Sequence, residues 1–226
     1  MIEKIFDSKK PVYIVGGGTS LRGFDFSLLD KKQHIAVNAA MYDCHNAQIG
    51  FFADKRFYND FGMSLWNFRN PKGDPYNKND GIIYTTFEGA NDDSWSDSRT
   101  VIIDSENESI FSKKILGSFS NSGLMAINLA YLLGARKIYL LGFDCSNTGE
   151  HDRYHTRYKR KISEDSYAKM IKDFKELSSY INKNVKDLEI TNISENSLLN
   201  VFPRIPYKDV FNNKIRSKKN GNIGRN

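Results

Sequence analysis

Two histidines and an aspartate in the second half of the chain are the side chains best suited to acid–base chemistry. Asp144 ends the apolar run LLGFD, and His151 and His155 follow it in a polar stretch. An imidazole titrates near neutral pH, so either histidine could act as a general acid or base. The spacing leaves the choice between them open, and a solvated charged loop is the alternative interpretation.

The spacing of these histidines also raises the question of zinc. His151 and His155 form an H-x-x-x-H pattern, which could bind Zn²⁺ if it lay on a helix. However, the glutamate of H-E-x-x-H is absent, and Gly149 favours a loop. Cys44 and Cys145 are far apart in the sequence and form no C-x-x-C pair. We therefore expect no zinc site.

Other charged residues could meet an anion or a magnesium ion. Arg153, Arg157 and Lys159 lie among or after the histidines and could neutralise a diphosphate leaving group. Earlier in the chain, Asp54 ends an apolar run and is followed by a lysine and an arginine. If the reaction needs Mg²⁺, Asp54 and Asp144 are the candidate ligands. An exposed charged turn is the alternative for Asp54.

A glycine-rich turn near the N-terminus is typical of phosphate binding. In YIVGGGTSL, an apolar run leads into Gly16, Gly17 and Gly18, then Thr19 and Ser20. Three glycines let the backbone turn tightly and approach an anion, and a serine could donate to a phosphate. The turn lacks the lysine of G-x-x-x-x-G-K-S/T and does not match G-x-G-x-x-G. A tight turn without a ligand is the alternative.

Two further polar groups follow or precede apolar segments. Asn38 ends the run HIAVN, where its amide could contact a base or a ribose, or satisfy loop backbone groups. Asn121, Ser122 and Gly123 precede an apolar helical segment. These residue types favour an N-cap, and the free N–H groups at a helix start also bind anions, so both interpretations are compatible.

The elements that must position these residues alternate between strands and helices. We expect strands within the apolar runs 11–17, 34–40, 49–54, 81–87, 100–104, 135–144 and 187–194. Helices are expected at 121–133, which Gly134 ends, and at 163–181, which is amphipathic with Ser163 as its N-cap. This order predicts an α/β fold: a single doubly wound, mostly parallel, Rossmann-like sheet with helices on both faces. Ligands bind beyond the carboxyl ends of such strands, where the candidate residues cluster.

Composition limits the class of protein. The chain has 226 residues and a net charge of +6, and no apolar run is long enough for a membrane span. With no recognisable secretory signal and only two cysteines, we expect a cytoplasmic protein. We expect one domain over residues 1–210 and a basic, disordered tail over 211–226. A basic tail is compatible with a nucleic-acid partner.

Four segments, taken in order, resemble a known group of transferases. GGGTSL, VNAAMY, SNSGLMAINLAYLLGARKIYLLGFDC and ISENSLLNVF occur in the order seen in family-42 bacterial sialyltransferases. The order is similar to that of the Rossmann-like family of archaeal 6-hydroxymethylpterin pyrophosphokinase, whose domain flagellin-modifying motility-associated glycosyltransferases share. The chain also resembles bacteriophage proteins with a G-F-D strand end and a His-rich loop. The similarity spans residues 12–202.

The resemblance implies roles for several positions. In the sialyltransferases the turn reads G-N-G-P-S-L and contacts a cytidine monophosphate donor. Gly17 and Thr19 depart from that pattern. The positions that match family residues at the nucleotide, the helix start or the strand end are Gly16, Gly18, Ser20, Leu21, Asn38, Ser122, Gly123 and Asp144. His151 and His155 are the candidates for the catalytic histidine. Tyr154 and Tyr158 are possible counterparts of its paired tyrosines.

The resemblance also implies a function. It favours a transferase that uses a nucleotide-activated donor, most readily a glycosyltransferase that uses a nucleotide sugar. The expected location is the cytoplasm, or the host cytoplasm if the protein is encoded by a bacteriophage. The acceptor would be a glycan or small molecule, with modified DNA as a further option, and a homo-oligomer is compatible. The alternatives are a Mg²⁺-dependent pyrophosphokinase using ATP and a nucleotide-binding module without catalysis.

Overall fold

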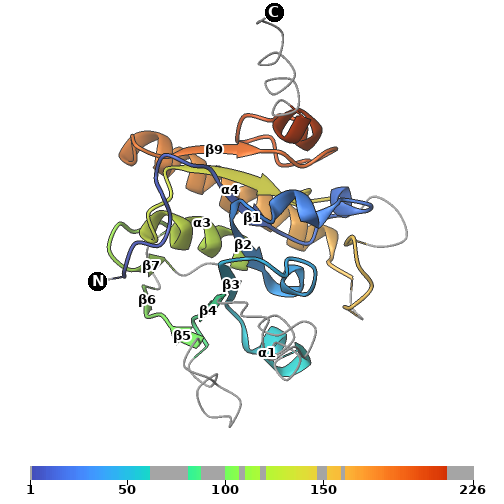
Figure 1. Cartoon of the computed structure of the whole chain (residues 1–226), viewed down its shortest axis with the longest axis horizontal. Helices are drawn as coiled ribbons and strands as arrows, with labels where there is room; N and C mark the ends of the chain where they lie inside the picture. The colour runs from blue at the N-terminus through green and yellow to red at the C-terminus, as the bar shows by residue number, and fades with distance from the viewer. Residues whose placement is uncertain are drawn as a thin grey trace, which may run out of the picture.

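The main element of the fold is a parallel sheet. The computed structural model describes residues 2–61, 81–87, 100–106, 110–117, 121–146, 152–158 and 161–212. Seven strands pair in the order β5-β4-β3-β2-β1-β8-β9, and every neighbouring pair is parallel (Figure 1). The strands are β1 (Val12–Val15), β2 (Gln33–Val37), β3 (Ile49–Phe52), β4 (Ile82–Thr85), β5 (Thr100–Ile102), β8 (Lys137–Leu141) and β9 (Glu189–Asn192). The α/β prediction and all seven expected strands are confirmed.

The order of the strands reverses between β1 and β8. Strand β1 pairs with β2 on one side and with β8 on the other, with Val12 opposite both Gln33 and Ile138. Strands β2 to β5 lie on one side of β1, and the chain then crosses back to place β8 and β9 on the other. In a doubly wound sheet, a crevice opens beyond the carboxyl ends of the strands at such a reversal.

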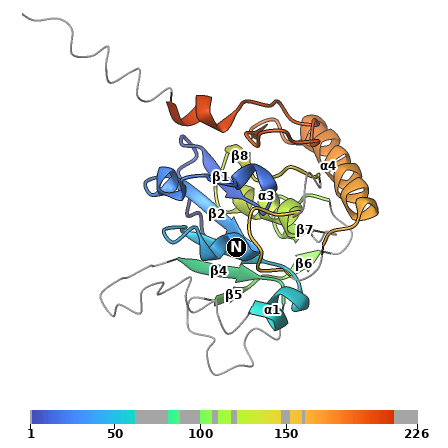
Figure 2. The same cartoon turned by 90° about the vertical axis from the view of Figure 1, so that its right-hand side faces the viewer.

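The side chains of each strand alternate between the two faces of the sheet. Val12 and Ile14 pack on the face that carries α3 (Ser122–Leu132) and α4 (Glu164–Asn184). In Figure 2, α4 lies to the right of β1 and β2. Tyr13 and Val15 pack on the opposite face of the sheet. That face is covered by shorter segments, η1 (Thr19–Leu21), η2 (Phe26–Leu29), η3 (Asn38–Tyr42) and α1 (Lys55–Phe61). Helical segments therefore cover both faces, but both long helices lie on the same one.

Both long helices begin where the sequence predicts, and α3 also ends there, whereas α4 continues past the expected residue 181 to Asn184. Helix α4 begins after Ser163, whose side chain accepts a hydrogen bond from the Ser166 N–H. Helix α3 follows Asn121, whose Oδ1 accepts from the Leu124 N–H at 3.0 Å. Gly134, at φ +109°, terminates α3 in a conformation that favours glycine. The start of α3 is thus fixed beside the carboxyl end of the sheet.

A second, two-stranded sheet is a feature that the sequence pattern did not predict. Strand β6 (Ser105–Glu106) pairs with β7 (Leu116–Gly117) in parallel. The connection beside it is held by Asn128, a buried amide in the middle of α3. Its Oδ1 accepts from the N–H groups of Ser112 and Gly117, and its Nδ2 donates to the Ser112 carbonyl at 2.7 Å. One side chain therefore binds three backbone groups of this connection.

Replacing Asn128 by alanine is expected to lower the free energy of unfolding by about 1–3 kcal/mol, because buried backbone groups lose their partners. Urea denaturation of the variant measures this change. Asn182→Ala, at an exposed position of α4, is the matched control and should stay within about 0.5 kcal/mol of the parent chain. Equal stability of the two variants would contradict the role given to Asn128.

The C-terminal boundary of the folded part differs from the expected one. Residues 207–212 are helical, and the Phe211 ring lies 5.4 Å from the Tyr13 ring and 5.9 Å from the Phe24 ring. Phe211 was expected in the tail, but apolar contacts with β1 place it in the folded part. The rest of the expected tail, from residue 213, lies outside the described residues. None of the helices in the described part of the chain is long and apolar enough to cross a membrane.

Candidate functional site

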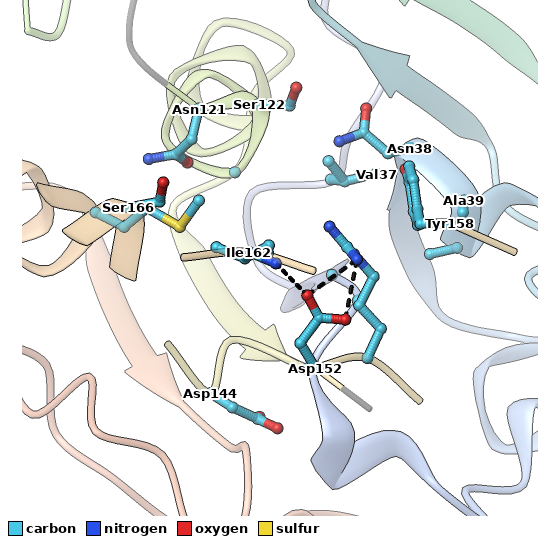
Figure 3. Close-up of a pocket in the computed structure, with 18 of the residues that line it drawn as sticks. Val37, Asn38, Ala39, Asn121, Ser122, Asp144, Asp152, Tyr158, Ile162 and Ser166 are labelled. Carbon is cyan, nitrogen blue, oxygen red and sulfur yellow. Dashed lines mark hydrogen bonds and ion pairs between the residues drawn. The ribbon is translucent and has the colours of Figure 1, made fainter. Parts of the chain in front are cut away.

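A pocket of about 1080 Å³ opens at the reversal of strand order, beyond the carboxyl ends of β1 and β8. Its wall combines the turn after β1, the starts of η3, α1, α3 and α4, and the loop 152–158 (Figure 3). The residues singled out in the sequence that line it include Gly16, Gly17, Gly18, Asn38, Asp54, Asn121, Ser122, Gly123, Asp144, Arg153, His155, Arg157 and Tyr158. Segments far apart in the chain thus form one concave site, as the parallel sheet predicts.

The three glycines of the turn have different roles. A Cβ on Gly16 would lie 2.7 Å from the Gly142 carbonyl oxygen, and a Cβ on Gly18 would lie 2.5 Å from Asp144 Cγ. A Cβ on Gly17 would meet only the Arg153 side chain, at 3.8 Å. The close contact between the ends of β1 and β8 therefore requires glycine at 16 and 18. At Gly17 there is room for a side chain.

Asp144 is bound to the glycine turn. Its carboxylate accepts from Ser20 Oγ at 2.5 Å, from the Ser20 N–H at 2.6 Å and from Thr19 Oγ1 at 3.1 Å. Asp144 is only 3% exposed, and burial raises its pKa despite these hydrogen bonds. The hydroxyls of Thr19 and Ser20, which were expected to meet a ligand, instead donate to Asp144. This geometry gives Asp144 a positioning role at the turn.

The end of β8 is supported by a second buried network. The Phe143 N–H donates to Ser194 Oγ at 2.8 Å, and Ser197 Oγ donates to the Phe143 carbonyl at 2.7 Å. Asn192 at the end of β9 donates to Ser197 Oγ at 2.9 Å. The polar residues that follow β9 therefore orient the strand end that carries Asp144.

Four residues that line this pocket each carry a buried polar atom without a partner. In the described ranges of the chain, the buried side-chain atoms that make no hydrogen bond are Asn38 Oδ1, Asn121 Nδ2, Ser146 Oγ and His155 Nε2. All four residues line the same pocket. A buried polar atom without a partner costs about 1–3 kcal/mol, so native proteins rarely keep one without a reason. A polar ligand in the pocket would supply the missing partners.

Asn38 and Asn121 both line the pocket, and in Figure 3 they lie on opposite sides of the view, above Ile162 and Asp152. Asn38 follows β2 with a φ of +52°, a left-handed conformation that is uncommon for residues other than glycine. Backbone strain of this kind is concentrated at functional sites. Asn121 caps α3 through Oδ1, which leaves Nδ2 as its unpaired donor. The sequence identified Asn121 as a helix cap, in a segment whose N–H groups could also bind an anion.

His155 presents a hydrogen-bond donor to the pocket. Its Nδ1 accepts from the Arg157 N–H at 3.3 Å, so the proton of the neutral ring is on Nε2. Burial, with Arg157 and Arg153 nearby, lowers the pKa of His155 to about 4. The ring is therefore neutral at pH 7. His151, the other candidate, lies outside the described residues.

The low pKa of His155 predicts a loss of stability in acid. Between about pH 6.5 and 4 the unfolded chain binds a proton at His155 that the folded chain does not, so the free energy of unfolding falls as the pH falls. Burial also lowers the pKa of His34, so this residue too makes the folded state less stable as the pH falls. His155→Asn should therefore show a smaller loss of stability between pH 7 and pH 5 in urea denaturation. Asp144 contributes equally to the pH dependence of both proteins, so its effect cancels in the comparison. A loss of stability in the variant as large as that of the parent chain would contradict this assignment.

The basic residues of the loop are paired with carboxylates. Arg153 contacts Asp152 at 3.0 Å, and its guanidinium lies 4.2 Å from the centroid of the Tyr158 ring. Of the two tyrosines compared with the sialyltransferase pair, Tyr158 lines the pocket, whereas the Tyr154 hydroxyl donates to Asp43. Lys159 lies outside the described residues. The two arginines of this loop that line the pocket, Arg153 and Arg157, are thus paired with Asp152 and Asp43.

The two candidate magnesium ligands, Asp54 and Asp144, both line the pocket, and each accepts hydrogen bonds within the protein. Asp54 is exposed, and its Oδ1 accepts from the Phe57 N–H at 2.8 Å at the start of α1. Asp144 is engaged by the turn. Within the described parts of the chain, no three His, Cys, Asp or Glu residues are grouped so that they could hold a metal ion.

Among the polar residues of the pocket wall, Ser146 and Asp152 were not predicted as ligand contacts. Ser146 follows the same strand end as Asp144, so its position after β8 was an available signal. Asp152 is buried and accepts hydrogen bonds from the Ile162 N–H and from Arg153. Nothing local in the sequence distinguishes such a buried aspartate from an exposed one.

Comparisons with known proteins show what the fold is similar to. No protein-family model and no curated protein matches the sequence. Among solved structures, the chain is similar to the MAf glycosyltransferase from Magnetospirillum magneticum AMB-1, with a TM-score of 0.61 and 14% identity over 94% of this chain. The match covers 37% of that longer protein. The chain is also similar to the monofunctional alpha-2,3-sialyltransferase Cst-I from Campylobacter jejuni, with a TM-score of 0.54 and 16% identity over 97% of this chain and 99% of that one. These likenesses show a shared fold.

Proposed function

We propose that this chain is a transferase that uses a nucleotide-activated donor, and that the transferred group is a sugar. The observation that carries the proposal is that four residues lining one pocket, at the reversal of strand order, each carry an unpaired buried polar atom. The two similar structures are those of a glycosyltransferase and a sialyltransferase, which supports the choice of a sugar donor.

The donor would be held by groups of opposite hydrogen-bonding character. The backbone of Gly16, Gly17 and Gly18, the start of α3 and Asn121 Nδ2 offer close approach and N–H donors to the phosphate. Asn38 Oδ1 is an acceptor, so it would bind an amino group of the base or a ribose hydroxyl. Thr19 and Ser20 would act indirectly, by fixing the turn to Asp144.

His155 would act on the leaving group. In the reaction an acceptor hydroxyl attacks the anomeric carbon, the bond from that carbon to the phosphate oxygen breaks, and the hydroxyl proton is released. Negative charge then develops on the phosphate, and Nε2–H of His155 can donate to it. The alternative role is that of a general base that takes the proton of the acceptor hydroxyl. A base would need a free lone pair on Nε2, so the Nε2–H tautomer favours the leaving-group role.

The pyrophosphokinase alternative is less well supported. It would use Asp144 to hold Mg²⁺, yet both oxygens of that carboxylate accept hydrogen bonds from the glycine turn. Binding a metal there would take these oxygens away from Thr19 and Ser20. The acceptor, whether a glycan, a small molecule or modified DNA, is not identified by the pocket residues.

A thermal-shift screen of nucleotides and nucleotide sugars tests the proposal. A ligand present at about 100 times its Kd stabilises the folded state by about 2.7 kcal/mol, which raises the melting temperature. We expect one nucleotide class to raise it, Asn38→Ala to abolish the rise, and Asn182→Ala to retain it. Slow hydrolysis of the matching nucleotide sugar should follow. Turnover of ATP with Mg²⁺ and no hydrolysis of any nucleotide sugar would overturn the proposal.

A further inference from the structure

Asp43, which lies outside the pocket wall, accepts three hydrogen bonds from the loop that carries His155. Its Oδ2 accepts from the Tyr154 hydroxyl at 2.6 Å and from Arg157 NH1 at 2.7 Å, and its Oδ1 accepts from Arg157 NH2 at 3.0 Å. The pair with Arg157 is bidentate, a geometry that fixes orientation as well as distance. The Asp43 side chain is 26% exposed, so these bonds are only partly screened by water.

The two residues that Asp43 binds lie on either side of His155 in the chain. The Arg157 N–H donates to His155 Nδ1, and the Tyr154 ring meets the His155 ring edge-on at 4.7 Å. The Arg157 guanidinium also lies 5.1 Å from the centroid of the Tyr42 ring, in the segment just before Asp43. The loop is thus fixed on both sides of the histidine to the segment that begins with Asn38.

We propose that Asp43 is a positioning residue for His155: by holding Tyr154 and Arg157, it keeps Arg157 N–H on Nδ1 and Nε2–H directed into the pocket. The consequence for turnover rests on the proposed function. The consequence for the orientation of the ring does not, and it can be measured without a substrate.

Charge gives Asp43 a second effect on the same ring. Arg157 and Arg153 lower the pKa of His155, whereas Asp43 and Asp152 raise it. Tyr154 and Tyr158 are the other titratable groups against the ring. Without the Asp43 carboxylate, the Arg157 charge is no longer balanced, so the pKa of His155 should fall further.

The chain contains a matched control far from the pocket wall. Asp187 accepts from Arg136 at 2.8 Å and from the Tyr131 hydroxyl at 3.3 Å, so it also joins an arginine and a tyrosine. Neither Asp187 nor its partners line the pocket. Asp187→Asn therefore removes a similar network without touching the loop of His155.

The test combines nitrogen-15 NMR of the histidine rings with kinetics of donor turnover. His155→Asn assigns the signal of His155 among those of the four histidines. In the parent chain and in Asp187→Asn we expect the Nε2–H tautomer and a low pKa. In Asp43→Asn we expect a mixture of tautomers and a lower pKa. We also expect kcat of this variant to fall about 10- to 100-fold, which is part of the rate enhancement that a general acid or base provides. The Kd of the nucleotide should change much less.

Arg157→Lys gives an independent measurement if Asp43→Asn does not fold. It keeps the positive charge and the backbone N–H but loses the bidentate pair, so the tautomer should again become mixed. A His155 signal unchanged in either folded variant would overturn the proposal, as would an equal loss of kcat in Asp187→Asn. If the parent chain binds no nucleotide and turns over no donor, the proposed function fails, while the ring signals still decide the role of Asp43.

Discussion

His155→Asn is expected to lower turnover of a bound nucleotide-activated donor about 10²- to 10⁴-fold. The reason is that Nε2 is the donor directed into the pocket, while Nδ1 is occupied by the Arg157 N–H. Steady-state kinetics with the nucleotide sugar found in the thermal-shift screen measure the effect. Nucleotide affinity should be largely retained, because the turn and Asn38 are untouched.

The control for this variant is His155→Gln. A glutamine amide reaches the position of Nε2 and can still donate a hydrogen bond, whereas an asparagine amide reaches only that of Nδ1. We therefore expect glutamine to retain more activity than asparagine. Full activity in both variants would show that the protein needs no histidine at this position, which would support a nucleotide-binding module without catalysis.

Gly18→Ala is expected to destabilise the protein by about 3–5 kcal/mol, combining overpacking with lost hydrogen bonds. The new Cβ would lie 2.5 Å from Asp144 Cγ and 2.7 Å from both carboxylate oxygens. Asp144 cannot move away without breaking its bonds to Thr19 and Ser20. Urea denaturation measures the loss, and nucleotide binding should be lost with it.

Gly17→Ala is the matched variant one residue away. Its Cβ would meet only Arg153, at 3.8 Å, so the folded state has room for it. Alanine also restricts the unfolded chain, which favours folding by about 0.4–1 kcal/mol at compatible positions. We therefore expect little or no loss of stability. If the two variants were equally unstable, the packing roles assigned to the turn would be wrong.

The fold could be predicted because its signals are local. Each buried parallel strand is a short continuous apolar run, and the amphipathic face of α4 follows Ser163 at helical spacing. The small sheet of β6 and β7 was missed because strands of two residues leave no periodicity. Phe211 was placed in the tail together with the polar residues that follow it, and only its contacts with Tyr13 and Phe24 reveal that it is partly buried.

The site was predicted in part, for a related reason. Gly16, Asn38, Ser122 and Asp144 stand at strand ends or at a helix start, and a parallel sheet brings such positions to one edge. What Asp144 does there could not be read from its position. A carboxylate after a strand can bind a metal, a substrate or a neighbouring turn, and only the approach of Thr19 and Ser20 decides between them.

The amino-acid sequence by itself determined the parallel α/β fold and the edge of the sheet at which a ligand would bind. The reason is that apolar runs, helical periodicity and the order of elements can be recognised in short stretches of sequence. The tertiary structure alone decided which polar atoms are left unpaired in the pocket and which are used to hold it together. That division depends on contacts between residues more than 100 positions apart, such as Ser20 with Asp144 and Asp43 with Arg157. No local pattern encodes them, since each partner is defined only when the strands and loops pack.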